Sequence, residues 1–319
     1  MKKIIKMIFY RIKHNKAYLF FPIVVTPIII ALSINFTQNM TSSINIAIVG
    51  CSDISLHQSD GINISYLDVK PPFSEVMDGK YDAVITTENG NYSIETIKGS
   101  TVKNAIEDML QGKSPSFDTS FATRGEISNL TGFIMMFVLS TGVMLYKFYY
   151  EEKGGLEMRI LSSPISNTKY ILSHVLTVFL TIFIPIIIIT STYEIIWGFD
   201  TNISVLEISS IIFLMSLLGS TLGLFISSII NSDENAVLVG TMTVICTTLL
   251  SGSFKEIASN NVTKFISSLL PQKYILDYAI SLENNKSVNL MGVLYVIILS
   301  FAFVLLSLYF NKRRLINSK

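Results

Sequence analysis

Charged residues are scarce in this 319-residue sequence: Asp, Glu, Lys and Arg together make up 15% of it, whereas hydrophobic residues make up 50%. A soluble globular chain carries about 25% charged residues. So little charge excludes an ordinary soluble protein and indicates a chain that lies largely in a lipid bilayer. The net charge of +1 points to no charged partner, and we expect no nucleic-acid partner.

The sequence also has few residues that could form a disulfide, a metal site or a catalytic centre. Its two cysteines, Cys51 and Cys246, fall in segments of different character, so we expect no intramolecular disulfide. The three histidines, His14, His57 and His174, are far apart and lack metal-ligand spacing. We therefore expect neither a metal site nor an enzyme active site, and we interpret His174 as a packed or interfacial side chain.

The sequence also lacks the features by which a transporter would obtain energy from ATP or from an ion gradient. No GxxxxGK[ST] motif occurs, so this chain has no P-loop with which to bind ATP. The long apolar stretches hold no carboxylate or lysine near their middle, where ion-coupled transporters place such a group. We therefore expect a chain without a cofactor and without an energy source of its own.

Six stretches lack charged residues over about the length that a helix needs to cross roughly 30 Å of hydrocarbon. We expect the first to be a retained span, because no small-x-small cleavage site follows it before Asn39. Gly219 and Gly223 form a GxxxG motif in the fourth, which serves packing or dimerisation, and we favour packing. The six predicted transmembrane helices are residues 17–36, 127–146, 170–193, 208–230, 235–254 and 287–311.

Charge is distributed unevenly among the connecting segments. Residues 1–16, 147–169 and 312–319, with the short connection after residue 230, hold 14 basic and 5 acidic residues, and the other segments hold 10 basic and 18 acidic residues. Basic residues concentrate on the cytoplasmic side of membrane proteins. We therefore expect a multi-pass protein of a bacterial plasma membrane, with both termini in the cytoplasm.

The first 16 residues show helical periodicity, with lysines opposite an apolar arc. The pattern predicts an amphipathic helix whose apolar face lies in the acyl boundary and whose lysines face anionic lipid headgroups. A plain basic flank that only orients insertion is the alternative interpretation. The apolar arc consists of Ile4, Ile5, Ile8, Phe9 and Ile12.

Residues 37–126 differ from the rest because charges, turn residues and short alternating runs replace the long apolar stretches. The alternation predicts strands at residues 44–49, 63–69, 81–87 and 91–97. A short helix opened by Pro72 and a second helix ending at Gly112 are also expected. Together they predict a small α/β domain outside the cytoplasm, between the first two spans.

The cytoplasmic segment 147–169 contains a pair of glycines, Gly154 and Gly155. Two glycines cost about 2 kcal/mol of helix propensity relative to two alanines, so the chain is expected to turn there. Residues 156–162 then predict a short helix lying against the membrane. Pro164 ends it, before Ser166 or Asn167 caps the next span.

This segment resembles the loop after the second span in the membrane subunits of type-2 ABC exporters. In that family the loop contains a coupling helix, which docks into a separate ATPase subunit. The resemblance implies that Glu157 and Arg159 contact the ATPase and that Ile160 and Leu161 anchor the helix. Gly154 and Leu156 depart from the usual pattern. The matching residues are Glu151, Gly155, Glu157, Leu161, Ser163 and Pro164.

The wider arrangement is similar to the subgroup of that family with an extracytoplasmic domain between the first two spans. Its members have an outer hairpin of short helices before the last span, and residues 255–286 look like that hairpin. The run Leu270-Pro271-x-x-Tyr274 is similar to a Leu-Pro step that recurs there, which implies a role for these residues at an outer gate.

The resemblance implies a polytopic α-helical permease subunit of an ABC exporter, with ATP and Mg²⁺ bound by the partner ATPase. Two permease subunits, identical or related, would form the pathway among membrane lipids. Apolar spans favour an amphiphilic cargo, such as a peptide toxin, bacteriocin, drug or lipid-like molecule. A membrane-anchored sensor or scaffold, whose outer domain binds a ligand, is one alternative. A membrane-embedded enzyme is another, but it would need clustered His, Asp or Glu.

Overall fold

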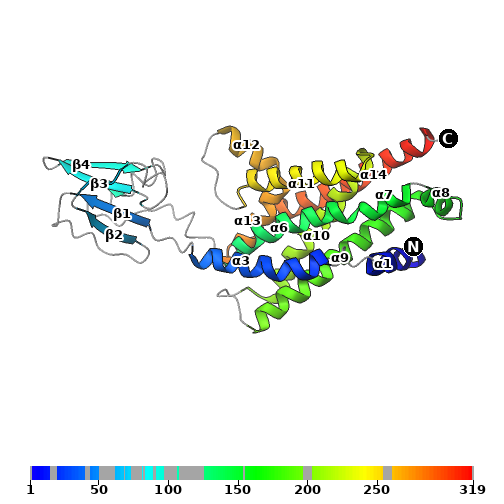
Figure 1. Cartoon of the computed structure of the whole chain (residues 1–319), viewed down its shortest axis with the longest axis horizontal. Helices are drawn as coiled ribbons and strands as arrows, with labels where there is room; N and C mark the ends of the chain where they lie inside the picture. Colours follow the sequence, from blue (N-terminus) through cyan, green and yellow to red (C-terminus); the bar gives the residue numbers. More distant parts are fainter. Residues whose placement is uncertain are drawn as a thin grey trace. The chain divides into compact units, whose positions relative to one another are not determined.

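The computed structural model describes residues 2–14, 20–39, 44–49, 62–67, 69–72, 81, 83–88, 91–96, 106–107, 126–153, 155–196, 203–253 and 261–317. The chain divides into two compact units, one of residues 1–35 and 125–319 and one of residues 36–124. The first is helical and the second contains a β-sheet (Figure 1).

The helices account for most of the described chain. Proline shapes the first apolar stretch: because Pro27 has no backbone N–H, the carbonyl of Ile23 loses its α-helical donor, and a π-helix, η1, occupies Phe21–Val25. In chain order the helices are α1 (Lys2–His14), η1 (Phe21–Val25), α3 (Thr26–Asn39), α6 (Glu126–Leu145), α7 (Lys147–Lys153), α8 (Leu156–Leu161), α9 (Asn167–Ile196), α10 (Val205–Ile229), α11 (Asp233–Leu250), α12 (Asn261–Leu269), α13 (Pro271–Glu283) and α14 (Leu290–Asn317).

Four helices in the described residues are long and apolar enough to cross a membrane, where the sequence predicted six. The first predicted span corresponds to η1 and α3, within which the described apolar helix is the shorter Pro22–Ser33. The fifth corresponds to α11, which has only 18 residues and carries Asp233 and Glu234 in its first turn. The four candidate spans are Ile127–Lys153, Asn167–Ile196, Val205–Ile229 and Leu290–Ile316.

Several predicted spans begin or end elsewhere than expected, α11 and α14 among them. Helix α11 stops at Leu250 rather than at residue 254, because Gly252 adopts a φ of 79°, which only glycine readily takes, and its N–H bonds back to Leu249. Helix α14 begins at Leu290 and continues to Asn317, so most of the segment expected to be a tail from residue 312 is helical.

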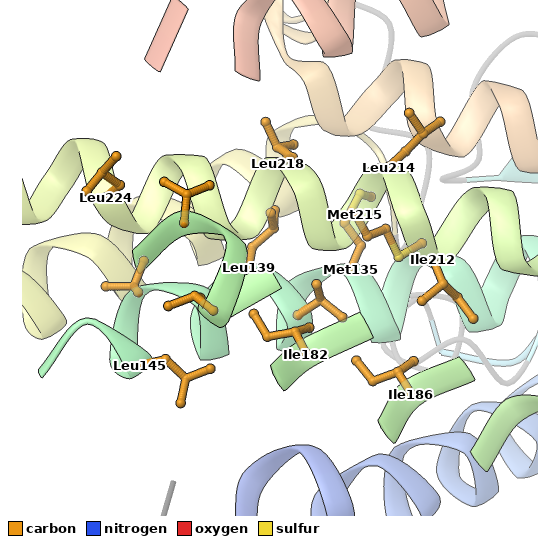
Figure 2. Close-up of a cluster of buried hydrophobic side chains, with 14 of the residues drawn as sticks. Met135, Leu139, Leu145, Ile182, Ile186, Ile212, Leu214, Met215, Leu218 and Leu224 are labelled. Atoms are coloured by element: carbon orange, nitrogen blue, oxygen red, sulfur yellow. The ribbon is translucent and has the colours of Figure 1, made fainter. Parts of the chain in front are cut away.

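Helices α6 and α10 pack together at the centre of the helical unit. A Cβ added at Gly223 would collide with the backbone of Gly142 and the ring of Tyr146, so the two helices approach closely at these positions. The GxxxG motif is therefore used for packing inside the bundle, as predicted. Figure 2 shows part of the apolar core of the helical unit, which includes Met135, Leu139, Ile182, Ile186, Met215 and Leu218.

The amphipathic helix α1 is present, but its apolar face does not point where we expected. Ile4, Ile8 and Ile12 are buried in the same core as the spans, and α1 packs against α9. Phe9, at the edge of the same apolar arc, remains 44% exposed. The isoleucines recur every four residues and so form one stripe along the helix. This stripe is buried against other helices of the protein rather than facing lipid.

The second unit contains a four-stranded sheet, which confirms the four predicted strands. Its order is β2-β1-β3-β4, with β1 parallel to β2 and β3, and β4 antiparallel to β3. The central strand β1 is buried on both faces, since neighbouring Ile46, Ala47 and Ile48 are all fully buried. The predicted helices and Cys51 lie largely outside the described residues. The strands are β1 (Ile44–Val49), β2 (Ile62–Leu67), β3 (Ala83–Glu88) and β4 (Asn91–Thr96).

The helical unit has two distinct ends. Helices α1, α7 and α8 and the C-terminal part of α14 lie together at one end, which we call the loop end (Figure 1). Helices α12 and α13 and the start of α6 lie at the other, which we call the hairpin end. Both termini of the described chain are therefore at the loop end.

Candidate functional site: the loop between α6 and α9

The candidate site is the segment that joins α6 to α9, and its path follows from its glycine, proline and serine residues. Helix α7 ends at Lys153, and Gly155 adopts a φ of 132°, so the chain turns there as predicted. Helix α8 follows from Leu156 to Leu161. Ser166 then caps α9, with its hydroxyl accepting from Lys169 N at 3.4 Å. Gly154 lies outside the described residues.

Glu152, on α7, is the most strongly bound carboxylate of the loop. Its side chain is fully buried. Arg11 Nη1 of α1 donates to Oε1 at 2.5 Å, and the Tyr170 hydroxyl of α9 donates to Oε2 at 2.5 Å. His174 Nε2 lies 3.1 Å from the same Oε2. One buried carboxylate thus ties α7 to both α1 and α9.

The surroundings of Glu152 are aromatic, which keeps water away from the ion pair. The His174 ring is fully buried and packs against the rings of Phe148, Tyr149 and Tyr170, at centroid distances of 5.7, 5.0 and 4.7 Å. This confirms that His174 is a packed side chain. Because interactions between charges strengthen in such a low-dielectric setting, the orientation of α1 is fixed relative to α7 and α9.

Two neighbours of Glu152 extend the connections of the loop to other helices. Lys153 Nζ donates to the carbonyl of Ser227, in the last turn of α10, at 2.6 Å, and it lies over the ring of Tyr150. The Tyr150 hydroxyl donates to the carbonyl of Ile230, just after α10, at 2.9 Å. A cation at the carbonyl end of a helix interacts favourably with the helix dipole. Helix α7 is therefore also bound to the end of α10.

Glu157, on α8, is oriented differently from what the resemblance implied. Its side chain is only 4% exposed, and Arg314 Nη2 of α14 donates to its Oε2 at 2.5 Å. Within the described residues its other oxygen, Oε1, has no hydrogen-bond partner. The carboxylate forms an ion pair with another residue of the same chain, because α14 continues far enough to bring Arg314 beside it. Glu157 is thus not available as an exposed contact.

The exposed face of α8 is formed by other residues. Leu156 and Met158 are 41% and 43% exposed, and Arg159 is exposed beside them. Ile160 and Leu161 pack against the core of the bundle. Ser163 and Pro164 are exposed after the helix. The loop therefore presents a small apolar surface with one cation on a firmly held helix.

The hairpin residues singled out from the sequence lie at the other end of the unit. Leu270 separates α12 from α13, and Pro271 occupies the first turn of α13, where its missing N–H costs nothing. The Tyr274 hydroxyl donates to the Ser268 carbonyl at 2.7 Å, and the Tyr295 hydroxyl to the Leu269 carbonyl at 2.8 Å. These bonds fix the step between the two short helices and attach it to α14.

A comparison of the sequence with protein-family models gives a match that includes this loop. Residues 109–284 match the family model described as ABC-2 type transporter. The chain belongs to the ABC-2 type transporter family. It is therefore a multi-pass membrane protein and a permease domain, a transport subunit without catalytic activity of its own. Such a permease implies ATPase partners. A search among curated proteins found no match.

The matched region of this ABC-2 permease contains both buried carboxylates of the loop but neither of the arginines that bind them. Glu152 and Glu157 lie within residues 109–284, whereas Arg11 and Arg314 lie outside. Sequence reasoning found Glu157 and missed its partner, and it did not single out Glu152 at all. The sequence holds only weak signs of these pairs. Glu152 follows two residues after the aromatic run Phe148 to Tyr150, and an arginine lies about one turn before the end of each terminal helix.

Proposed function

We propose that this permease is the membrane subunit of an ATP-driven exporter and that a separate ATPase docks on the exposed face of α8. The proposal is supported by one observation: α8 exposes a contact surface, and buried ion pairs hold the segment that carries α8 to neighbouring helices. Leu156, Met158 and Arg159 are exposed, while the segment that carries them is held by the buried carboxylates Glu152 and Glu157. Movement of a docked partner would be passed to several helices at once.

The same proposal includes six membrane crossings with the loop end in the cytoplasm. Both described termini lie at the loop end, which requires an even number of crossings between them. Four candidate spans, with η1 and α3 as one crossing and α11 as another, give that even number. The excess of basic residues in the same segments supports a cytoplasmic assignment and a bacterial plasma membrane.

We further propose that cargo passes between two permease subunits rather than through one. The cavity among α6, α9 and α10 has a volume of about 20 Å³ and is lined mainly by apolar side chains, with Thr131 and Thr190 among them, which leaves room for little more than one water molecule. A second permease, identical or related, would then supply the other wall. The apolar outward faces of α11 and α14 favour an amphiphilic cargo. ATP and Mg²⁺ would bind only to the ATPase.

Co-purification of the permease with the ATPase encoded beside it tests the docking surface. Arg159→Glu and Met158→Asp change only exposed positions of α8, and either change should lower the recovered ATPase by about tenfold, which corresponds to about 1.4 kcal/mol. Lys264→Glu, an exposed change at the hairpin end, is the control and should leave recovery unchanged. Wild-type recovery from both α8 variants would refute docking at α8, and a wild type that never retains an ATPase would favour the sensor alternative.

A further inference from the structure

The ion pair between Glu157 and Arg314 joins two helices that are far apart in the sequence. Helix α8 lies in the loop, and Arg314 lies one turn before the end of α14, 157 residues later. The pair is largely shielded from water, since the Glu157 side chain is 4% and the Arg314 side chain 26% exposed. Screening by salt is weak for such a pair, so the attraction between the two side chains persists at physiological ionic strength.

Arg314 is itself held in place by neighbouring amides. Arg314 Nη2 also donates a hydrogen bond to Asn311 Oδ1 at 2.8 Å, and Asn311 Nδ2 donates one to Asn167 Oδ1 at 3.3 Å. Asn311 is buried and Asn167 is the first residue of α9. The guanidinium is therefore positioned by α14 and, through Asn311, by α9 before it meets α8.

Helix α14 connects this contact to the opposite end of the molecule. Its 28 residues correspond to about 42 Å at 1.5 Å per residue, enough to reach from the loop end to the hairpin end. At the hairpin end, Tyr295 bonds to the Leu269 carbonyl, and Gly292 packs against the ring of Tyr274. Along its length α14 packs against α10 and α13. A displacement of the C-terminal end of α14 would therefore also shift the helix where it contacts α13 and the step between α12 and α13.

We propose that Arg314 is a positioning residue for coupling: it holds α8 to α14, so that movement of a docked ATPase reaches the last span and the hairpin. The inference rests on the proposed function, because it takes α8 as the docking helix. Arg314 does not contact the ATPase in this account. Its neighbour Arg313 is exposed and carries the same charge, which makes it a matched control.

The test uses the assembled permease–ATPase complex in lipid vesicles and needs no cargo. A cysteine reporter, Met291→Cys, is placed in the first turn of α14, where the native side chain is 77% exposed, after Cys51 and Cys246 are changed to serine. The rate of its reaction with a water-soluble maleimide is measured without nucleotide and with Mg-ATP plus vanadate. In the wild-type background we expect the rate to change when the ATPase is trapped.

Arg314→Gln should abolish that nucleotide-dependent change while the ATPase remains bound, and Arg313→Gln should leave it intact. Arg314→Lys, which keeps a cation that can still reach the carboxylate, should retain most of the change. The double substitution Glu157→Arg with Arg314→Glu should restore it. Arg314→Gln with the wild-type response would overturn the proposal, as would a Lys variant that folds and binds ATPase but responds no better than Gln.

A wrong proposed function and a wrong positioning role give different experimental results. If the reporter-free wild-type permease retains no ATPase, the proposed function is wrong and the positioning role falls with it. If ATPase is retained and the reporter responds to vanadate, but equally in the Arg314→Gln and Arg313→Gln variants, only the positioning role is wrong. Should Arg314→Gln fail to fold, the charge-swapped pair decides the question: a pair that folds and binds ATPase but lacks the nucleotide-dependent change would overturn the positioning role, and one that shows the change supports it.

Discussion

The loop end and the hairpin end of the helical unit are held together by different kinds of interaction. At the loop end, the carboxylates of Glu152 and Glu157 are buried and paired with arginines from α1 and α14. At the hairpin end, neutral hydroxyls of Tyr274 and Tyr295 donate to backbone carbonyls. The hairpin end also contains a carboxylate, Glu283, which accepts hydrogen bonds from the backbone N–H groups of Ile127 and Ser128 at the start of α6.

This difference indicates which end resists deformation. A buried ion pair that loses its partner leaves an uncompensated charge away from water, so the helices that share it are held in one arrangement. A neutral hydrogen bond contributes only about 0.5–1.5 kcal/mol net, and a nearby carbonyl or water can replace its acceptor. We therefore expect the loop end to move as one body and the hairpin end to rearrange more easily.

The largest effect is expected at Glu152. Glu152→Leu removes the carboxylate and leaves Arg11, Tyr170 and His174 without it, which should lower the free energy of unfolding by about 3–5 kcal/mol. Glu151→Leu is the matched control: it lies next to Glu152 and also pairs with Arg11, at 3.0 Å, but its side chain is 50% exposed. An exposed pair is worth at most about 1 kcal/mol. Thermal unfolding in detergent compares the two.

An equal loss of stability in the two variants would break the contrast between the ends, since burial of the carboxylate would then not matter. The interaction should also depend little on ionic strength. Raising the salt concentration is expected to leave the loss of stability in Glu152→Leu largely unchanged and to reduce the loss in Glu151→Leu, because buried pairs are screened much less than exposed ones.

An intermediate effect is expected at Glu283. This carboxylate satisfies two of the free N–H groups at the start of α6, so Glu283→Ala should cost about 1–2 kcal/mol, in the range measured for the loss of a helix cap. Glu283→Gln keeps one acceptor oxygen and should lose less. Hydrogen exchange in the first turn of α6 gives a local measurement, and unchanged protection in the Ala variant would contradict the capping role.

The smallest effect is expected for the tyrosine hydroxyls. Tyr274→Phe and Tyr295→Phe each remove one neutral hydrogen bond and keep the ring, so each should cost about 0.5–1.5 kcal/mol. Tyr309→Phe, an exposed change at the loop end of α14, should be close to neutral. Unfolding midpoints of the three variants test the order. A tyrosine variant that destabilises the protein more than Glu152→Leu would reverse the contrast between the two ends.

Local sequence signals predicted the elements well and their partners poorly. Alternation placed the four strands and the glycine pair placed the turn before α8, because each depends on neighbouring residues. The pairing of Glu152 with Arg11, and of Glu157 with Arg314, joins residues more than 140 positions apart. No periodicity encodes such contacts.

The same limit explains the two errors at the ends of the chain. The isoleucine stripe of α1 was assigned to lipid, because a helical wheel shows that a face is apolar but not what covers it. The basic end of α14 was expected to be a tail, since the sequence Lys312-Arg313-Arg314 reads as a flank until a buried carboxylate is seen beside it. Both corrections come from packing between distant segments.

Cross-linking between the permease and its ATPase tests the central claim most directly. In a background with Cys51 and Cys246 changed to serine, Met158→Cys on α8 and Lys264→Cys at the hairpin end would each carry the same thiol-attached photo-crosslinker in membranes that contain the ATPase. The account predicts that the α8 position forms a covalent adduct with the ATPase and that the hairpin position does not. An adduct at the hairpin position, or none at α8 although the ATPase co-purifies, would contradict it.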